Sequence, residues 1–205
     1  MTDIRGYVLA GGQSSRMGSD KALLSVDEHT SIERQCELLE SCCSQGVFIA
    51  GARSKELHGL RWTVVQDAHQ DQGPLSGIVA ALQHAEMNRQ STHGIALIIA
   101  VDLVALGQVD ITALISASSQ DLYTESDVFF AQSQQDKSEH GAQPLCAAWR
   151  TKTSLSVLSR QFSDGQRSVM KAWLALARQG VAIPEARLIN INSPGDYENY
   201  RRAKG

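Results

Sequence analysis

The chain has little of several residue types that mark special classes of protein. Its 205 residues include only four cysteines and four prolines, and aromatic residues make up 5% of the sequence. The cysteines contain no C-x-x-C pair, and their spacing suits neither a zinc site nor a disulfide framework. We therefore predict reduced thiols in a cytoplasmic protein, with Cys36 and Cys43 in the core of the domain.

Long apolar runs and an excess of charge are missing as well. No apolar run approaches the ~18 residues of a membrane-spanning helix, and the first residues lack the pattern of a secretory signal. The net charge of −3 offers no basic surface for nucleic acid, so a bound polyanion must be held by local cations. The composition predicts one domain, residues 1–205, that binds neither nucleic acid nor membranes.

Short apolar runs alternate with helical patterns along most of the chain. Strands are predicted at residues 7–10, 47–50, 62–65, 95–101, 128–131, 145–149 and 187–192. A first helix is predicted from a capping box at Thr30 and Glu33 to Gly46, a second after Gly73 and a third over 169–177. Exposed loops are predicted at 118–126 and 133–141. This alternation predicts a three-layer, Rossmann-like α/β domain with a mostly parallel central sheet. Ligands of such sheets bind beyond the carboxyl ends of the strands.

A glycine-containing loop follows the first predicted strand. It reads LAGGQSSRMGSDK over residues 9–21. Gly11 and Gly12 allow the backbone to approach a ligand closely, and Arg16 and Lys21 add two cations. The spacing matches neither a P-loop nor a G-x-G-x-x-G motif. We predict a loop that holds a nucleoside triphosphate, and the alternative is a solvated turn with incidental cations.

An aspartate ends the most apolar run of the sequence. Asp102 directly follows residues 95–101, which are apolar on both faces of the predicted strand. The carboxylate is either a Mg²⁺ ligand or the N-cap of a following helix. Magnesium sites use one or two carboxylates together with substrate phosphates, so the nearby glycine loop favours the metal interpretation.

Two weaker candidates lie after other predicted strands. Asp67 could accept hydrogen bonds from a ribose or a base, although Asp71 is equally available. Asn190 and Asn192 alternate along the last predicted strand, where they either face a substrate or bond only to the backbone. These residue types alone do not decide between the alternatives.

Taken together, these motifs resemble those of the molybdenum cofactor guanylyltransferase family. The residues that carry the resemblance are the glycine loop, the GPLSG turn at 73–77, Asp102, the QPL triplet at 143–145 and the NINSP segment at 190–194. The resemblance implies transfer of GMP from Mg²⁺-bound GTP to the terminal phosphate of molybdopterin, with release of pyrophosphate. It names GTP and molybdopterin as partners, with molybdenum-insertion and molybdoenzyme-maturation proteins as further candidates.

The resemblance also assigns roles to individual residues. It implies that the nucleotide is contacted by Leu9, Ala10, Gly11, Gly12, Lys21, Asp67 and Asp102. It further implies that Asp102 binds Mg²⁺ and that Asn190 and Asn192 face the molybdopterin, with Arg16, Lys21, Asp102 and Asn192 as the catalytic set. Two alternatives stay open, namely a molybdopterin cytidylyltransferase or related nucleotidyltransferase, and a non-catalytic nucleotide-binding regulatory protein.

Overall fold

A computed structural model gives the structure of the chain. It describes residues 2–10, 21–26, 28–52, 57, 59–67, 69, 72–120, 125–191 and 193–204. Within these residues a seven-stranded sheet has the order β5-β4-β1-β6-β8-β7-β9. The strands are β1 (Asp3–Leu9), β4 (Val47–Ala50), β5 (Thr63–Val64), β6 (Gly94–Ala100), β7 (Val128–Ser133), β8 (Ala142–Arg150) and β9 (Arg178–Ile183). Only β8 runs antiparallel to its neighbours, which confirms the predicted mostly parallel α/β sheet.

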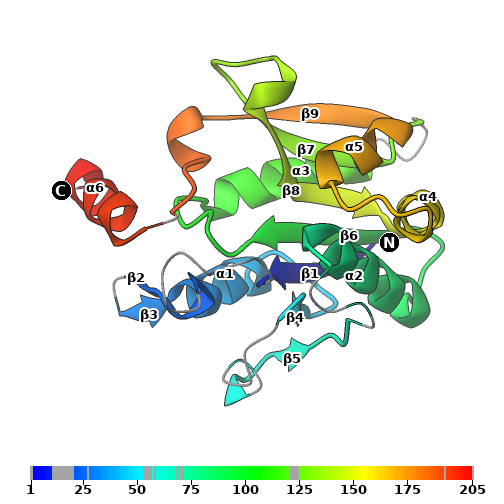
Figure 1. Cartoon of the computed structure of the whole chain (residues 1–205), viewed down its shortest axis with the longest axis horizontal. Helices are drawn as coiled ribbons and strands as arrows, with labels where there is room; N and C mark the ends of the chain where they lie inside the picture. Colours follow the sequence, from blue (N-terminus) through cyan, green and yellow to red (C-terminus); the bar gives the residue numbers. More distant parts are fainter. Residues whose placement is uncertain are drawn as a thin grey trace.

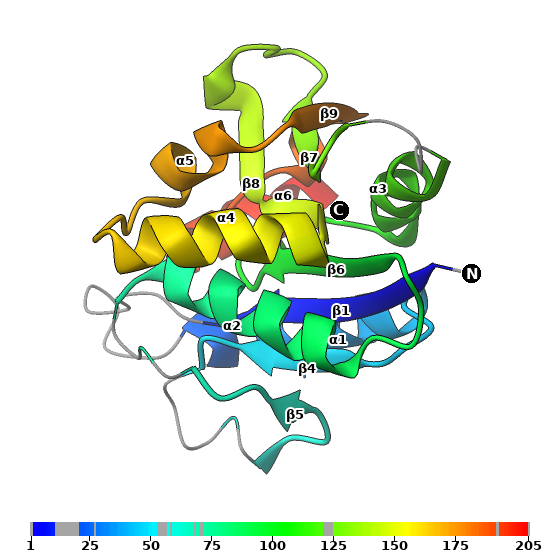
Figure 2. The same ribbon diagram turned by 90° about the vertical axis from the view of Figure 1, so that its right-hand side faces the viewer.

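Helices cover both faces of this sheet (Figures 1 and 2). Helices α1 (Ser31–Glu40) and α3 (Gln108–Gln120) pack on one face. The other face carries α2 (Pro74–Asn88), α4 (Thr151–Ser163) and α5 (Val169–Ala172). Helix α6 (Pro194–Lys204) projects beyond the carboxyl ends of the central strands (Figure 1). No helix in the described ranges has the length and apolar character that crossing a membrane requires.

Short elements complete the described chain. They are the strand pair β2 (Ser25–Val26) and β3 (His29–Thr30), and the 3₁₀-helices η1 (Lys21–Leu23), η3 (Glu139–Gly141), η4 (Trp173–Ala175) and η5 (Glu185–Arg187). Residues of β2, β3 and η1 lie between β1 and α1 in the sequence and contact α1. They therefore lead the chain from the glycine loop into the first helix.

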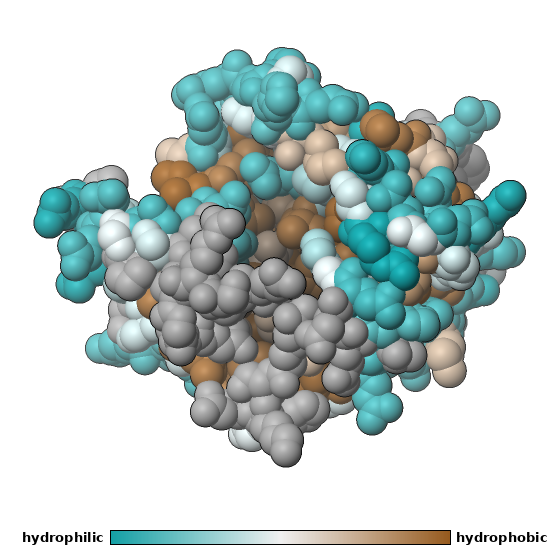
Figure 3. Space-filling view, viewed as in Figure 1, coloured by the Kyte–Doolittle hydropathy of each residue, from teal (hydrophilic) through white to brown (hydrophobic). Residues whose placement is uncertain are grey.

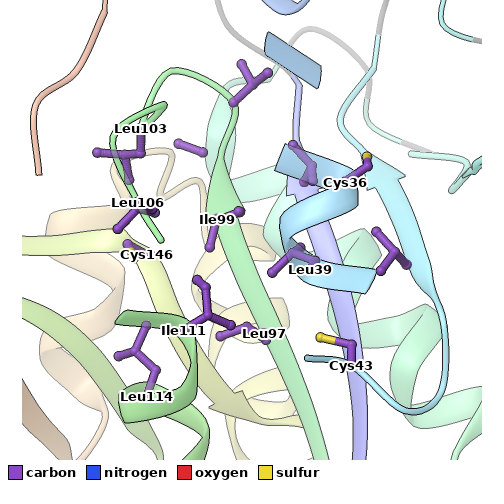
Figure 4. Close-up of a cluster of buried hydrophobic side chains, with 14 of the residues drawn as sticks. Cys36, Leu39, Cys43, Leu97, Ile99, Leu103, Leu106, Ile111, Leu114 and Cys146 are labelled. Carbon is purple, nitrogen blue, oxygen red and sulfur yellow. The ribbon is translucent and has the colours of Figure 1, made fainter. Parts of the chain in front are cut away.

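The core between α1, α3 and the sheet is shown in Figure 4. Leu97 and Ile99 of β6 face this core, while the alternating residues of β6 face α2 and α4. Because both faces of β6 are covered, the strand is apolar throughout. Cys36 and Cys43 are buried here, as predicted, and burial raises the pKa of the Cys43 thiol to about 12. That thiol is therefore protonated at neutral pH.

The start of α1 follows the predicted capping box. The Thr30 hydroxyl accepts a hydrogen bond from the Glu33 amide at 3.4 Å, and the Glu33 carboxylate accepts one from the Thr30 amide at 2.9 Å. The helix ends at Glu40 rather than running on to Gly46. Gly46 instead has a φ of 92° in the turn before β4, a backbone conformation that favours glycine.

The predicted strand over 187–192 is wrong. The last strand is β9, which ends at Ile183, and Pro184 and η5 follow it. Leu188 and Ile191 are the buried residues of the next stretch, and they lie three positions apart rather than two. The apolar pattern of this stretch therefore comes from an irregular segment in which Leu188 and Ile191 are buried.

Two other predicted boundaries need correction. The helix expected over 169–177 is the single turn of α5 followed by η4, so Leu174 is 52% exposed and Ala177 lies beyond the helical residues. Helix α3 continues to Gln120, which places the start of the loop expected at 118–126 inside a helix. No helix is predicted over 108–120 from the sequence, and its last, polar residues are assigned to the predicted loop, although a helix needs to bury only one face.

Candidate active site

The ends of β1 and β6 lie side by side at one edge of the sheet. These strands are parallel neighbours with Leu9 opposite Ala100, and the Val101 amide donates to the Leu9 carbonyl at 3.2 Å. Ala10 and Asp102 therefore leave the sheet at the same edge. Gly11, Gly12 and Arg16, which were predicted from the same loop, lie outside the described residues.

Asp102 occupies a turn rather than a helix start. It is half-buried, and α3 begins only at Gln108, so Asp102 is not the N-cap that one interpretation of the sequence suggested. Asp110 instead accepts a hydrogen bond from the Gly107 amide at 2.9 Å, within the first turn of α3. The N-cap alternative for Asp102 is therefore wrong.

Helix α1 fixes the backbone that follows Asp102. The fully buried Gln35 side chain donates to the Leu103 carbonyl at 2.6 Å, and the Arg34 guanidinium donates to the Val104 carbonyl at 2.9 Å. Sequence reasoning missed both contacts. The signal available was a polar Gln35 on the apolar side of α1, where an amide needs a buried partner.

The C-terminal segment also reaches the Asp102 turn. The Ile191 amide donates to the Asp102 carbonyl at 2.9 Å, and Ile191 itself is buried. Asn190, one residue earlier, is exposed beside this contact, whereas Asn192 lies outside the described residues. The structure thus brings the predicted asparagine segment to the predicted metal aspartate, although the two are far apart in sequence.

Helix α2 lies tightly against the end of β1. A Cβ added at Gly77 would lie 2.6 Å from Leu9 Cδ1 and 3.3 Å from the Gly51 Cα, so a larger residue would require Leu9 and the backbone at Gly51 to move. Leu9 and Ala10 are 3% and 8% exposed, with the Leu9 side chain in the core. Their backbone groups also bond within the sheet, since the Leu9 carbonyl accepts from the Val101 amide and the Ala10 amide donates to the Ala50 carbonyl at 2.9 Å. The nucleotide contacts of these two residues stay a prediction.

The remaining nucleotide candidates lie at the same edge or next to it. Asp67 follows β5, which is joined to β1 through the parallel strand β4, and its carboxylate accepts a hydrogen bond from the His69 amide at 2.8 Å. Asp71 lies outside the described residues. Lys21 is the first residue of η1, directly after the glycine loop. Its side chain is outside the described part of the structure.

The described residues fit a magnesium site and do not fit a zinc site. They contain no group of three or more His, Cys, Asp or Glu side chains that could hold a metal ion. Asp102 alone offers a carboxylate at the end of β6. A single carboxylate is sufficient for Mg²⁺, which takes its other ligands from substrate phosphates and water.

Comparison of the whole sequence with known protein families identifies the family of this chain. A sequence profile described as the MobA-like NTP transferase domain matches residues 6–179. The chain belongs to the MobA-like NTP transferase family. Two proteins named "Probable molybdenum cofactor guanylyltransferase" align with this chain over most of its length. One, from Rhodopirellula baltica, is 31% identical over 93% of this chain and 88% of its own length. The other, from Opitutus terrae, is 30% identical over 97% and 95%.

Solved structures of other proteins have the same fold as this MobA-like NTP transferase. The molybdopterin-guanine dinucleotide biosynthesis protein A of Archaeoglobus fulgidus superposes with a TM-score of 0.74 and 18% identity, covering 98% of each chain. The 2-C-methyl-D-erythritol 4-phosphate cytidylyltransferase of Thermus thermophilus gives a TM-score of 0.63 and 12% identity, covering 97% and 98%. These structures share the nucleotidyltransferase fold and confirm the predicted fold class. The predicted resemblance to the guanylyltransferase family is confirmed by the sequence relatives.

Proposed function

We propose that this nucleotidyltransferase moves GMP from GTP to the terminal phosphate of molybdopterin and releases pyrophosphate. The observation that carries the proposal is the parallel register of β1 on β6, which places the strand leading into the glycine loop beside Asp102. The substrates follow from near-full-length relatives named molybdenum cofactor guanylyltransferase. The geometry supports a site where a nucleoside triphosphate and an acidic residue share one edge of the sheet.

The reaction is a displacement at the α-phosphorus of GTP. An oxygen of the acceptor phosphate forms the new bond to phosphorus, and the bond to the pyrophosphate oxygen breaks. Both reactants are anions, so the protein must align them and offset their repulsion. We assign Arg16 and Lys21 to the nucleotide phosphates and Asn192 to the acceptor phosphate. Such a displacement requires no covalent enzyme intermediate.

Asp102 is the residue that we assign to Mg²⁺. When bound, the ion supplies positive charge to the phosphate oxygens of the nucleotide. The contribution of the chain is to hold the backbone of the turn that carries the carboxylate, because Gln35, Arg34 and Ile191 each bond to a carbonyl of that turn. We further assign the reaction to the cytoplasm, with handover of the product to molybdoenzyme-maturation proteins.

A comparison of four nucleotides tests the base and the activity together. Thermal shifts are measured with GTP, CTP, ATP and UTP in the presence of Mg²⁺, and GTP labelled at the α-phosphate is then mixed with molybdopterin. We expect selective stabilisation by GTP, about 2.7 kcal/mol at a hundredfold excess over Kd, and label in a dinucleotide product. Stabilisation by CTP alone would support a cytidylyltransferase. A shift with GTP but no labelled product would support a non-catalytic binding protein.

Lys21 gives a direct test of the glycine loop. Replacing Lys21 with Ala should weaken GTP binding by roughly 1.5–3 kcal/mol, because a charge-assisted contact to phosphate is lost. Lys171 of α5 is exposed and serves as the matched control, since Lys171→Ala removes the same charge away from the sheet edge. Calorimetry that gave equal GTP affinities for the two variants would remove the phosphate assignment.

A further inference from the structure

The sheet itself holds little of the connection that leads from β5 to α2. Strand β5 lies at the edge of the sheet, and only Thr63 and Val64 pair with β4. The Val65 amide adds one bond to the Ile49 carbonyl at 2.8 Å. Asp67, which the resemblance assigns to the nucleotide, lies two residues further along the chain. Its position must therefore be fixed by contacts outside the sheet.

His69 provides such contacts through both of its main-chain groups. Its amide donates to Asp67 Oδ1 at 2.8 Å, and its carbonyl accepts a hydrogen bond from the Gln72 amide at 3.3 Å. Among the described residues no group donates to Asp67 Oδ2, so that oxygen is available to a ligand. A carboxylate that accepts from its own chain takes its orientation from that chain. The backbone of His69 therefore sets the direction of the Asp67 carboxylate.

The imidazole ring of His69 packs on the end of α4. The centroids of the His69 and Phe162 rings are 5.0 Å apart, and the ring planes are tilted by 46°. The His69 side chain is exposed, whereas Phe162 is 6% exposed and belongs to the core under α2 and α4. Ring pairs at this separation stabilise a structure beyond the area that they bury. The contact therefore joins the edge of the sheet to a helix of the core.

Phe162 is in turn held in place by Arg167. The Arg167 guanidinium lies over the Phe162 ring, 4.0 Å from its centroid, and Nη1 donates to the Phe162 carbonyl at 2.7 Å. Figure 2 shows the carboxyl end of α4 and the amino end of α2 at the same end of this helix pair. In Figure 3 the surface at this end of α4 is mostly hydrophilic, in agreement with a covered aromatic ring. His69 thus packs on a ring whose position is fixed.

We propose that His69 is a positioning residue for the nucleotide, because the packing of its ring on Phe162 holds the backbone that orients Asp67. The inference rests on the proposed function, which supplies GTP, and on the assignment of Asp67 to that nucleotide. His69 acts through Asp67 and does not itself bind the nucleotide. Direct contact between the exposed His69 ring and the nucleotide is the other explanation, and the experiment separates the two.

The ring contact is tested by the affinity for GTP with Mg²⁺, measured by calorimetry. His69→Ala keeps the amide that donates to Asp67 and removes only the ring. We expect His69→Ala and Phe162→Leu each to weaken GTP binding about threefold to tenfold. The double variant should be no weaker than the weaker single variant, because both changes break the same contact. His69→Phe keeps a ring on Phe162 and should bind GTP within about twofold of wild type.

The route through Asp67 is tested by repeating His69→Ala in a chain that carries Asp67→Ala. Asp67→Ala alone should weaken GTP binding about tenfold or more, and the added His69→Ala should change it less than about twofold. A further loss in this background would show that the His69 ring contacts the nucleotide, which overturns the inference. In His69→Ala alone, KM for GTP should rise while kcat stays within about twofold, because other residues are assigned to the reacting phosphates.

His140→Ala is the matched control, since it removes an exposed imidazole from η3, in the connection between β7 and β8. It should leave GTP affinity unchanged, and the His69 variants should melt within a few degrees of wild type because that side chain is exposed. If Phe162→Leu unfolds, His69→Ala and His69→Phe still decide the question.

Equal GTP affinity in wild type and His69→Ala would overturn the inference. Unchanged affinity in Asp67→Ala would overturn it at its premise, while GMP transfer by wild type would still support the proposed function. A wild type that neither bound GTP nor formed the guanine dinucleotide would contradict the proposed function, and the inference would fail with it.

Discussion

The amino ends and the carboxyl ends of strands β1 and β6 differ in what their charged residues contact. At the amino ends, Asp3 and Arg5 are 3% and 5% exposed and form an ion pair. Arg5 also donates to the Asn88 carbonyl, and Asp3 accepts from the Gln90 amide at 2.6 Å. At the carboxyl ends, the half-buried Asp102 lies on a turn that main-chain contacts hold in place.

This difference separates stability from chemistry along the same two strands. At the amino ends the charged side chains themselves join β1 to the connection between α2 and β6. At the carboxyl ends the turn is held through its carbonyl groups, by bonds that do not depend on which side chain Asp102 has. A substitution at each end should therefore affect a different property of the protein.

The largest expected effect is on activity, at the carboxyl end. Asp102→Asn keeps the size of the side chain and removes the charge assigned to Mg²⁺. We expect the rate of GMP transfer to fall by at least about a hundredfold, while the melting temperature moves by only a few degrees. Transfer rates and calorimetric melting of the two proteins provide the test. A variant that unfolds at much lower temperature would show that Asp102 is mainly structural.

The next effect is on stability, at the amino end. Arg5→Met leaves the Asp3 carboxylate buried without its cation, and breaking such a pair costs about 3–5 kcal/mol. Urea unfolding should show this loss, while GMP transfer well below the melting temperature stays near the wild-type rate.

The double variant Asp3→Leu with Arg5→Met sharpens that test. It removes both charges and should recover part of the loss, though not all of it, because the Gln90 amide loses its acceptor. A double variant as unstable as Arg5→Met would show that packing, rather than the unpaired charge, causes the loss.

The same contrast explains how much of the fold could be predicted. Strands β4 and β6 were visible in the sequence because burial on both faces leaves a continuous apolar run. The strand β9 was missed because its sequence RQGVAI is mostly exposed, as its burial pattern shows. Asp3 and Arg5 were not recognised as a buried pair, because two charges near a terminus look like surface residues until the tertiary structure encloses them.

The candidate site divides in a similar way. Asp102 was identifiable because a charge directly follows seven apolar residues. Its supports at Gln35 and Arg34 were not, because each contact joins residues about seventy positions apart, namely 68 and 70. The pocket lined by Ala105 and by residues between 186 and 200 could not be predicted from the sequence for the same reason, since its wall forms only when the C-terminal segment returns to the end of β6.

The smallest expected effect concerns a structural feature close to the chemical edge. Thr30 caps α1, whose Gln35 and Arg34 hold the Asp102 turn, and Thr30→Ala should cost about 1 kcal/mol of stability. The Thr30 amide and the Thr30 hydroxyl both donate to the Glu33 carboxylate and hold its pKa below the usual value of 4.5, and Thr30→Ala removes only the hydroxyl's share. A lowered pKa means that the folded state gains stability above pH 4.5 and loses it as the pH falls through the folded pKa.

The stability difference between wild type and Thr30→Ala should therefore be largest at neutral pH and shrink in acid, below about pH 4.5. Urea unfolding at pH 7 and pH 3.5 measures it, with Glu33→Gln as the control that cannot titrate. A difference that stayed constant with pH would show that the Thr30 hydroxyl acts on the backbone alone. Because the cap stabilises α1 from outside the catalytic turn, GMP transfer at neutral pH should stay near the wild-type rate. The carboxyl edge would then contain separable residues for stability and for chemistry.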